Sequence, residues 1–125
     1  MKYVKNWGRL GMYFNKFANF YINQTGNVIT RDELDNQISI IIKKIETAIE
    51  ICKYLKQITI KVIDSRVYYM KTGHQKHGIT KEDYKKAIDV LSKLAEKDIQ
   101  NEQEKMFLKA LVECIKKSID NSQSY

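Results

Sequence analysis

The sequence predicts an all-α protein, a compact bundle of four to five helices forming a single domain over residues 1–125. Three observations lead there. The chain contains no proline. Its apolar residues recur at spacings of three and four, as amphipathic helices require. Three polar clusters each end in a helix-start signal of the Thr/Asn-x-x-Asp/Glu type, in which two side chains cap the first turn reciprocally. A chain of 125 residues buries enough surface to fold without metals or disulfides.

The first predicted helix, residues 3–22, is distinguished by its aromatic content. Seven aromatic residues fall within nineteen positions: Tyr3, Trp7, Tyr13, Phe14, Phe17, Phe20 and Tyr21. They cover more than one helix face, and a bundle of this size has too little core to bury them all. We therefore expect self-association or a dedicated partner surface on this helix.

The second helix is predicted to begin after Thr30, with Glu33 completing the capping signal. The apolar series then keeps its phase through Leu34, Ile38, Ile41, Ile45, Ala48, Cys52, Leu55, Ile58 and Val62. This pattern allows one long helix of about 40 residues, straight or kinked. A split near Gln57 is the alternative. Residues 58–70 are rich in β-branched and aromatic side chains, but they continue the helical spacing and are predicted to be helical.

Two further helices are predicted after Thr80 and after Asn101, whose capping partners are Asp83 and Glu104. The core stripe of the first comprises Tyr84, Ala87, Ile88, Leu91 and Leu94. The core stripe of the second comprises Phe107, Ala110, Leu111, Cys114 and Ile115. The polar tail, residues 121–125, is predicted to be frayed.

The two cysteines, Cys52 and Cys114, lie within apolar runs and are predicted to be reduced core residues. The N-terminal apolar run is interrupted by Asn15 and Lys16, and no small-residue cleavage site follows, so no signal peptide is expected. No uncharged apolar stretch approaches the roughly 18 to 20 residues that span a bilayer. We expect a cytoplasmic protein without a membrane span.

The net charge of +7 is unevenly distributed. Residues 1–30 contain four bases and no acid, and residues 61–81 contain five bases against Asp64 alone. In the remaining segments acids balance or slightly exceed bases. The predicted nucleic-acid-binding residues are the cations of the two basic segments and the adjoining loop histidines: Lys2, Lys5, Arg9, Lys16, Lys61, Arg66, Lys71, His74, Lys76 and His77.

Several cations on one surface give salt-sensitive binding to a nucleic-acid backbone by releasing counterions. Tyr69, beside Arg66 and Lys71, supplies a ring of the kind on which bases of a single strand stack. Two other interpretations stay open. The lysines are plain solvated residues in one, and the aromatic first helix lies on an anionic membrane surface in the other.

No catalytic chemistry is expected. His74 and His77 have the spacing of two metal ligands, but no Cys, Asp or Glu on the same loop completes a site. Arg66 and His74 are too far apart for the Arg-to-His motif of helical ribonucleases. No glycine-rich phosphate loop and no nucleophile triad is present. The sequence therefore predicts neither an enzyme nor a cofactor or metal site.

Three segments resemble the small subunit of CRISPR effector complexes. Gly8-Arg9-Leu10-Gly11 with the aromatic helix to Gln24 is similar to the opening helix of the equivalent C-terminal domain in the large subunit of related complexes. Residues 66–76 resemble a helix ending in Tyr-Ala-x-Gly-Arg-Gln, with His74 in place of the arginine. Residues 103–117, with Phe107 and Ala110-Leu111-Val112, look like the terminal helix, although Lys109 occupies the position of its acidic residue.

This resemblance implies a non-catalytic basic helical subunit that stacks in several copies within a ribonucleoprotein complex and holds a strand by its backbone. Its partners would be nucleic acid, without sequence preference, and other protein subunits, including copies of itself. The alternative function is a helical interaction protein of a mobile element, such as a bacteriocin-immunity protein, that does not bind nucleic acid.

Overall fold

The computed structural model describes the backbone of residues 2–122 and the side chains of residues 13–119. Its five helices are α1 (Lys2–Thr25), α2 (Arg31–Thr47), α3 (Lys53–Thr72), α4 (Lys81–Lys97) and α5 (Glu102–Ser122). Helices account for 79% of the chain, and no strand occurs within residues 2–122. The predicted all-α bundle is confirmed.

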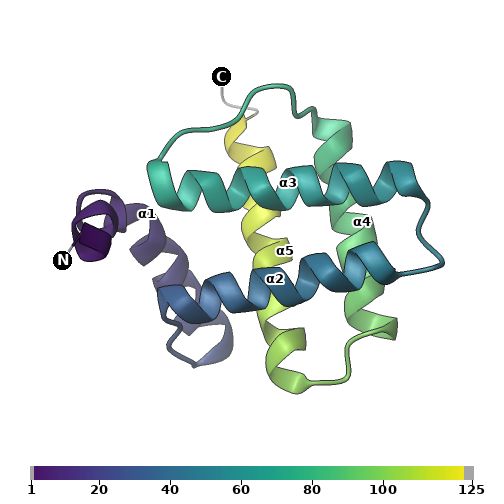
Figure 1. The fold of residues 1–125 in the computed structure, drawn as a ribbon, viewed down its shortest axis with the longest axis horizontal. Helices are drawn as coiled ribbons and strands as arrows, with labels where there is room; N and C mark the ends of the chain where they lie inside the picture. The colour runs from purple at the N-terminus through teal and green to yellow at the C-terminus, as the bar shows by residue number, and fades with distance from the viewer. Residues whose placement is uncertain (1, 123–125) are drawn as a thin grey trace.

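The helices form two crossed antiparallel pairs (Figure 1). The α2 and α3 helices run side by side in opposite directions and lie across the second pair, α4 and α5. The second half of α1 packs against α3 and α5 at one side of this arrangement. The loop formed by residues 73–80 runs from the end of α3 to the start of α4.

The core lies where the two pairs cross. Every helix contributes to it, and the largest fully buried side chains are Leu34, Ile41, Ile45, Ile63, Met70, Leu91, Leu94, Ile99, Phe107, Leu108, Leu111 and Ile115. The stripe predicted for α5 is buried throughout. In α4, Tyr84 and Ile88 are only half-buried against the core.

The long second helix allowed by the sequence is not formed. The chain leaves the helical conformation at Ala48, which is extended, and re-enters it after Cys52, about one helical turn before the suggested split at Gln57. A continuous helix of about 40 residues would be about 60 Å long, too long for both halves to reach one core. Folding back lets both halves bury their apolar stripes, and it leaves Ile49 in the turn 96% exposed.

Cys52 was expected in the core, and this expectation is wrong. It stands in the turn, directly before α3, and is exposed, whereas Cys114 is buried as predicted. The apolar residues whose regular spacing included Cys52 belong to two separate helices. Cys52 lies in the turn between these helices, where its side chain is not part of the core. The α5 helix continues to Ser122, and the fraying expected of residues 121–125 stays a prediction. Residues 123–125 lie outside the described part of the chain.

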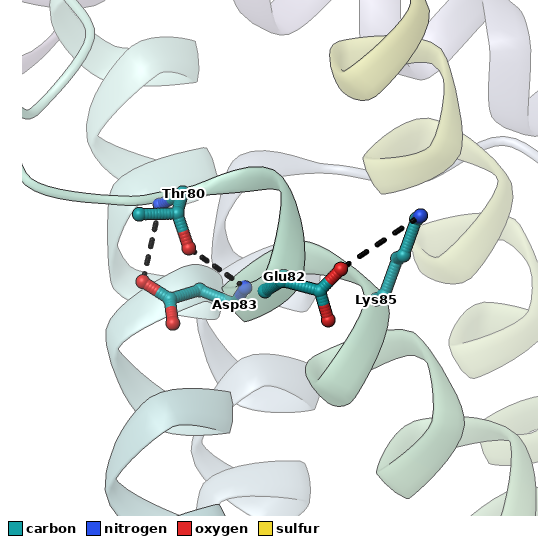
Figure 2. A network of polar contacts seen from close by, with 4 residues as sticks. All are labelled: Thr80, Glu82, Asp83 and Lys85. Atoms are coloured by element: carbon teal, nitrogen blue, oxygen red, sulfur yellow. Dashed lines mark hydrogen bonds and ion pairs between the residues drawn. The ribbon is translucent and has the colours of Figure 1, made fainter.

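The predicted capping signals are present. In the boxes of α2 and α4, the threonine hydroxyl accepts from the backbone amide three residues on, and the acid accepts from the threonine amide, all at 3.1 Å. Figure 2 shows the α4 box of Thr80 and Asp83, with an ion pair between Glu82 and Lys85 beside it. At α5, Asn101 accepts from the amide of Glu104 at 3.0 Å. These caps satisfy amides that a helix start otherwise leaves without partners.

The aromatic residues of α1 are divided between core and surface. Phe14, Phe17 and Tyr21 are buried, and the Phe17 and Tyr21 rings each lie 6.1 Å from the ring of Phe107. Tyr13 and Phe20 are half-buried, while the side chains of Tyr3 and Trp7 fall outside the described residues. The bundle thus buries three of the seven aromatic side chains and half-buries two, and the expected self-association stays a prediction.

Tyr13 determines which residue can end α3. Gly73, the C-cap, has a φ of +76°, a left-handed conformation that glycine adopts most readily. A Cβ atom built at this position would overlap the ring of Tyr13. The end of α3 is therefore restricted both by its backbone conformation and by the side chain that α1 packs on it.

Gly73→Ala should lower the free energy of unfolding by more than the roughly 1 to 2 kcal/mol of a left-handed alanine, because Tyr13 must also move. Gly26→Ala is the matched control. Its φ is +78° and a Cβ atom there has nothing within 4 Å. An alanine at this position therefore loses stability only through its left-handed backbone conformation. Urea denaturation followed by circular dichroism compares the two, and equal losses would show that Tyr13 does not restrict position 73.

Candidate nucleic-acid interface

A hollow of about 220 Å³ opens where α1, α3 and α5 meet. Its lining combines three cations, four aromatic rings and one thiol: Lys16, Arg66, Lys117, Tyr13, Phe17, Phe20, Tyr69 and Cys114. No acidic side chain is among them. The arrangement suits an anion that also presents a flat apolar surface.

Helical spacing brings these residues to one place. On α1, the adjacent residues Lys16 and Phe17 each lie three or four positions from both Tyr13 and Phe20, and on α3 and α5 the lining residues form pairs three apart. Residues at these spacings share one helix face. Each helix thus contributes one cation to the hollow, and cations from the two basic segments, Lys16 and Arg66, are placed together.

Arg66 is fixed in the hollow by its neighbours on α5. Its Nε donates to Cys114 Sγ at 3.2 Å, and one terminal nitrogen donates to Ser118 Oγ at 2.6 Å. The guanidinium also lies 4.6 Å from the centre of the Tyr69 ring. These contacts give a half-buried guanidinium a single orientation, so Arg66 is both a link between helices and a positioned positive charge.

Lys16 and Lys117 are exposed at the mouth of the hollow. The Lys117 ammonium lies 4.5 Å from the centre of the Phe20 ring, and the Lys16 ammonium lies 5.9 Å from that of Tyr13. Contacts of this kind at exposed sites are weak, about 0.5 to 1 kcal/mol. Both lysines can therefore turn from the rings toward an anion at little cost.

The Tyr69 ring, considered from sequence as a stacking platform, is already occupied. It is half-buried, carries Arg66 on its face, and meets Tyr13 edge-on at a centroid distance of 5.2 Å. Its neighbour Tyr68 is the more exposed ring, at 39%. Burial raises the pKa of Tyr84 on α4, and the positive charge of nearby Arg66 opposes that rise.

Two other basic residues of the second segment, Lys61 and Lys76, lie around the loop of residues 73–80. The Lys61 ammonium donates to the carbonyl of Gly78 at 2.9 Å and ties the loop to α3. The Lys76 ammonium lies 5.2 Å from the centre of the Tyr68 ring. His74 and His77 are exposed, and the His74 amide donates to the hydroxyl of Thr72 at 3.1 Å.

Lys71 is placed apart from both groups. It forms an ion pair with Asp35 of α2 at 3.5 Å, which offsets its charge. The side chains of Lys2, Lys5 and Arg9 lie outside the described residues. Of the ten residues predicted from sequence, the structure therefore gathers Lys16 with Arg66, and Lys61 and Lys76 with the two loop histidines.

Sequence reasoning missed Lys117. It belongs to a segment whose acids and bases nearly balance, so a count of charge along the chain hides it. A helical projection would have found it, because Lys117 follows Cys114 by three residues and lies beside that core stripe.

A larger hollow of about 420 Å³ lies between α4 and α5, near the end of α1. Its cations Lys105, Lys109 and Lys116 are accompanied by Glu96 and Glu113, and Glu113 pairs with Lys116 at 3.3 Å. Because the charges there compensate one another, this hollow has no clear preference for an anion.

Two further findings concern other functions. Among residues 13–119, no three side chains of the types that bind metals lie close enough together to hold an ion. In the described part of the chain, no helix combines the length and the apolar character needed to cross a membrane.

The contacts of Arg66 predict a stability effect that the lysines lack. Arg66→Ala should lower the free energy of unfolding by about 1 to 3 kcal/mol, since it removes hydrogen bonds from a charged donor to Ser118 and Cys114. Lys16→Ala and Lys117→Ala should each change it by less than about 1 kcal/mol, because each removes only a cation–π contact at an exposed site. Thermal and urea denaturation test this, and an Arg66→Ala variant as stable as the parent would contradict it.

Known proteins provide no assignment for this arrangement. Comparison of the chain with protein-family models, with curated proteins and with solved structures finds no match. The chemistry of the hollow and of the surface beside it is thus the basis on which a function is inferred.

Proposed function

We propose that this protein is a non-catalytic helical subunit that binds the sugar-phosphate backbone of a nucleic-acid strand without sequence preference. The observation that carries the proposal is the hollow at α1, α3 and α5, where Lys16, Arg66 and Lys117 converge and no acid is present. Guanidinium and ammonium groups bind phosphate oxygens through strong, charge-assisted hydrogen bonds.

The charge around α3 agrees with this. Residues 61–81, which include its C-terminal half, carry five bases against Asp64 alone, and their cations reach both the hollow and the loop of residues 73–80. A phosphate chain passing over the hollow would meet Lys16, Arg66 and Lys117, and Lys61 and Lys76 add positive charge at the loop of residues 73–80. Contact with several successive phosphates, and none with base edges, gives binding that is independent of sequence.

The resemblance to CRISPR small subunits leads us to propose an assembly in which this subunit works. In it, several copies of the chain stack beside a guide RNA and its target in a cytoplasmic ribonucleoprotein, as part of antiviral defence. The aromatic first helix would supply the contact between copies or with another protein of the assembly.

Salt dependence is the test. We expect the parent protein to shift a fluorescent single strand at about 50 mM salt and to lose most of that affinity at about 200 mM. Lys16→Ala and Lys117→Ala should each lower the slope of log affinity against log salt by about 0.7, the value for one phosphate contact on a single strand. Unrelated sequences should be affected equally.

Lys93→Ala is the matched control, because Lys93 is exposed on α4 and paired with Asp89 at 3.3 Å. It removes the same charge at a place outside the hollow. A parent that ignores nucleic acid at about 50 mM salt would refute the proposal and leave the interaction-protein alternative. An equal change of slope in all three variants would mean that net charge, and not the hollow, determines binding.

A further inference from the structure

Two exposed tyrosines lie in one row along α3. Tyr54, Lys61 and Tyr68 follow one another at intervals of seven residues, which is close to two helical turns, so they occupy the same side of the helix. Tyr54 is 59% exposed and Tyr68 is 39% exposed, which makes them the large exposed hydrophobic side chains of α3. The row is separate from the half-buried Tyr69 that lines the hollow.

Each ring in the row has a lysine from a neighbouring element beside it. The Lys86 ammonium of α4 lies 5.2 Å from the centre of the Tyr54 ring and 3.4 Å from its hydroxyl oxygen. The Lys76 ammonium of the loop lies 5.2 Å from the centre of the Tyr68 ring. Between them, Lys61 holds the loop through Gly78. Rings and cations therefore alternate along this side of α3, where Asp64, exposed between Lys61 and Tyr68, is the acid of the row.

We propose that Tyr54 and Tyr68 are stacking platforms for the bases of the strand, which makes the ligand a single strand and not a duplex. This inference rests on the proposed function. Every base presents a flat face to an aromatic ring, so stacking needs no particular sequence. Lysines beside the rings are placed to meet the phosphates that flank a stacked base.

The duplex is disfavoured because its bases are already stacked on one another, and exposing them costs energy. The spacing of the rings also sets a length. Fourteen residues of helix rise about 21 Å, which equals about six steps at the 3.4 Å rise per nucleotide of a strand stacked as in a duplex, and fewer steps of a more extended strand. A strand of about seven nucleotides reaches both rings, whereas a trinucleotide reaches one.

Fluorescence anisotropy with a labelled octanucleotide, a trinucleotide and a hairpin duplex tests this. Tyr54→Leu and Tyr68→Leu should each weaken octanucleotide binding about fivefold or more. Tyr68→Phe, which keeps the ring, should bind like the parent. The parent protein should bind the hairpin more weakly than the octanucleotide at the same salt concentration. When one tyrosine is replaced by leucine, the affinity for the octanucleotide should fall far more than the affinity for the trinucleotide.

Ile49→Ala is the control for loss of exposed apolar surface, because Ile49 lies in the turn outside the row. Binding of the octanucleotide that is unchanged in both leucine variants would overturn the inference while leaving backbone binding intact, and it would assign the tyrosines to a protein contact. A hairpin that binds as tightly as the single strand would overturn it too. A parent that binds neither ligand would remove the proposed function itself.

Discussion

The chain reverses direction between Thr47 and Lys53, and the rest of the structure depends on that reversal. No proline or glycine lies in residues 48–52. The turn forms because both flanking helices have apolar stripes that reach the same core only when the chain folds back. Burial of such side chains stabilises a fold by roughly 1.5 to 3 kcal/mol each, far more than the few helical hydrogen bonds lost in the turn. The turn thus brings the C-terminal half of α3 against α5 and α1, where the hollow forms.

Arg66 shows how this packing gives one residue two roles. Its hydrogen bonds to Cys114 and Ser118 connect α3 to α5, and its charge is held at the hollow in a single orientation. A positioned guanidinium loses little freedom when it binds an anion. Lys16 and Lys117 are exposed, and each is held by one weak contact with a ring. The site therefore combines one fixed cation with two adaptable ones, as suits a flexible chain of phosphates.

Much of the fold could be predicted from the sequence, because it depends on local signals. The capping residues Thr30, Thr80 and Asn101 each contact an amide three residues away, and apolar periodicity needs only a few turns to show. The turn at residues 48–52 could not be predicted, since the stripes on both sides stay in phase and the cause lies in tertiary packing. The site was visible in part. The distribution of charge along the sequence indicated Lys16 and Arg66. It did not indicate that Lys71 pairs with Asp35, or that Lys117 lines the hollow although it belongs to a segment with nearly equal numbers of acids and bases. Both facts depend on which helices are neighbours.

The contact between Tyr13 and Gly73 has a consequence for how this protein can vary. A side chain at position 73 competes for the space that the Tyr13 ring occupies. The residue that is tolerated at one of these positions therefore depends on the residue at the other. A larger residue at the end of α3 must displace the Tyr13 ring in addition to adopting a left-handed backbone conformation, and a smaller residue at position 13 removes only the first of these two costs. A smaller residue at position 13 removes a wall of the hollow and an edge contact to Tyr69. The residue that ends one helix thereby limits the shape of a surface to which three helices contribute.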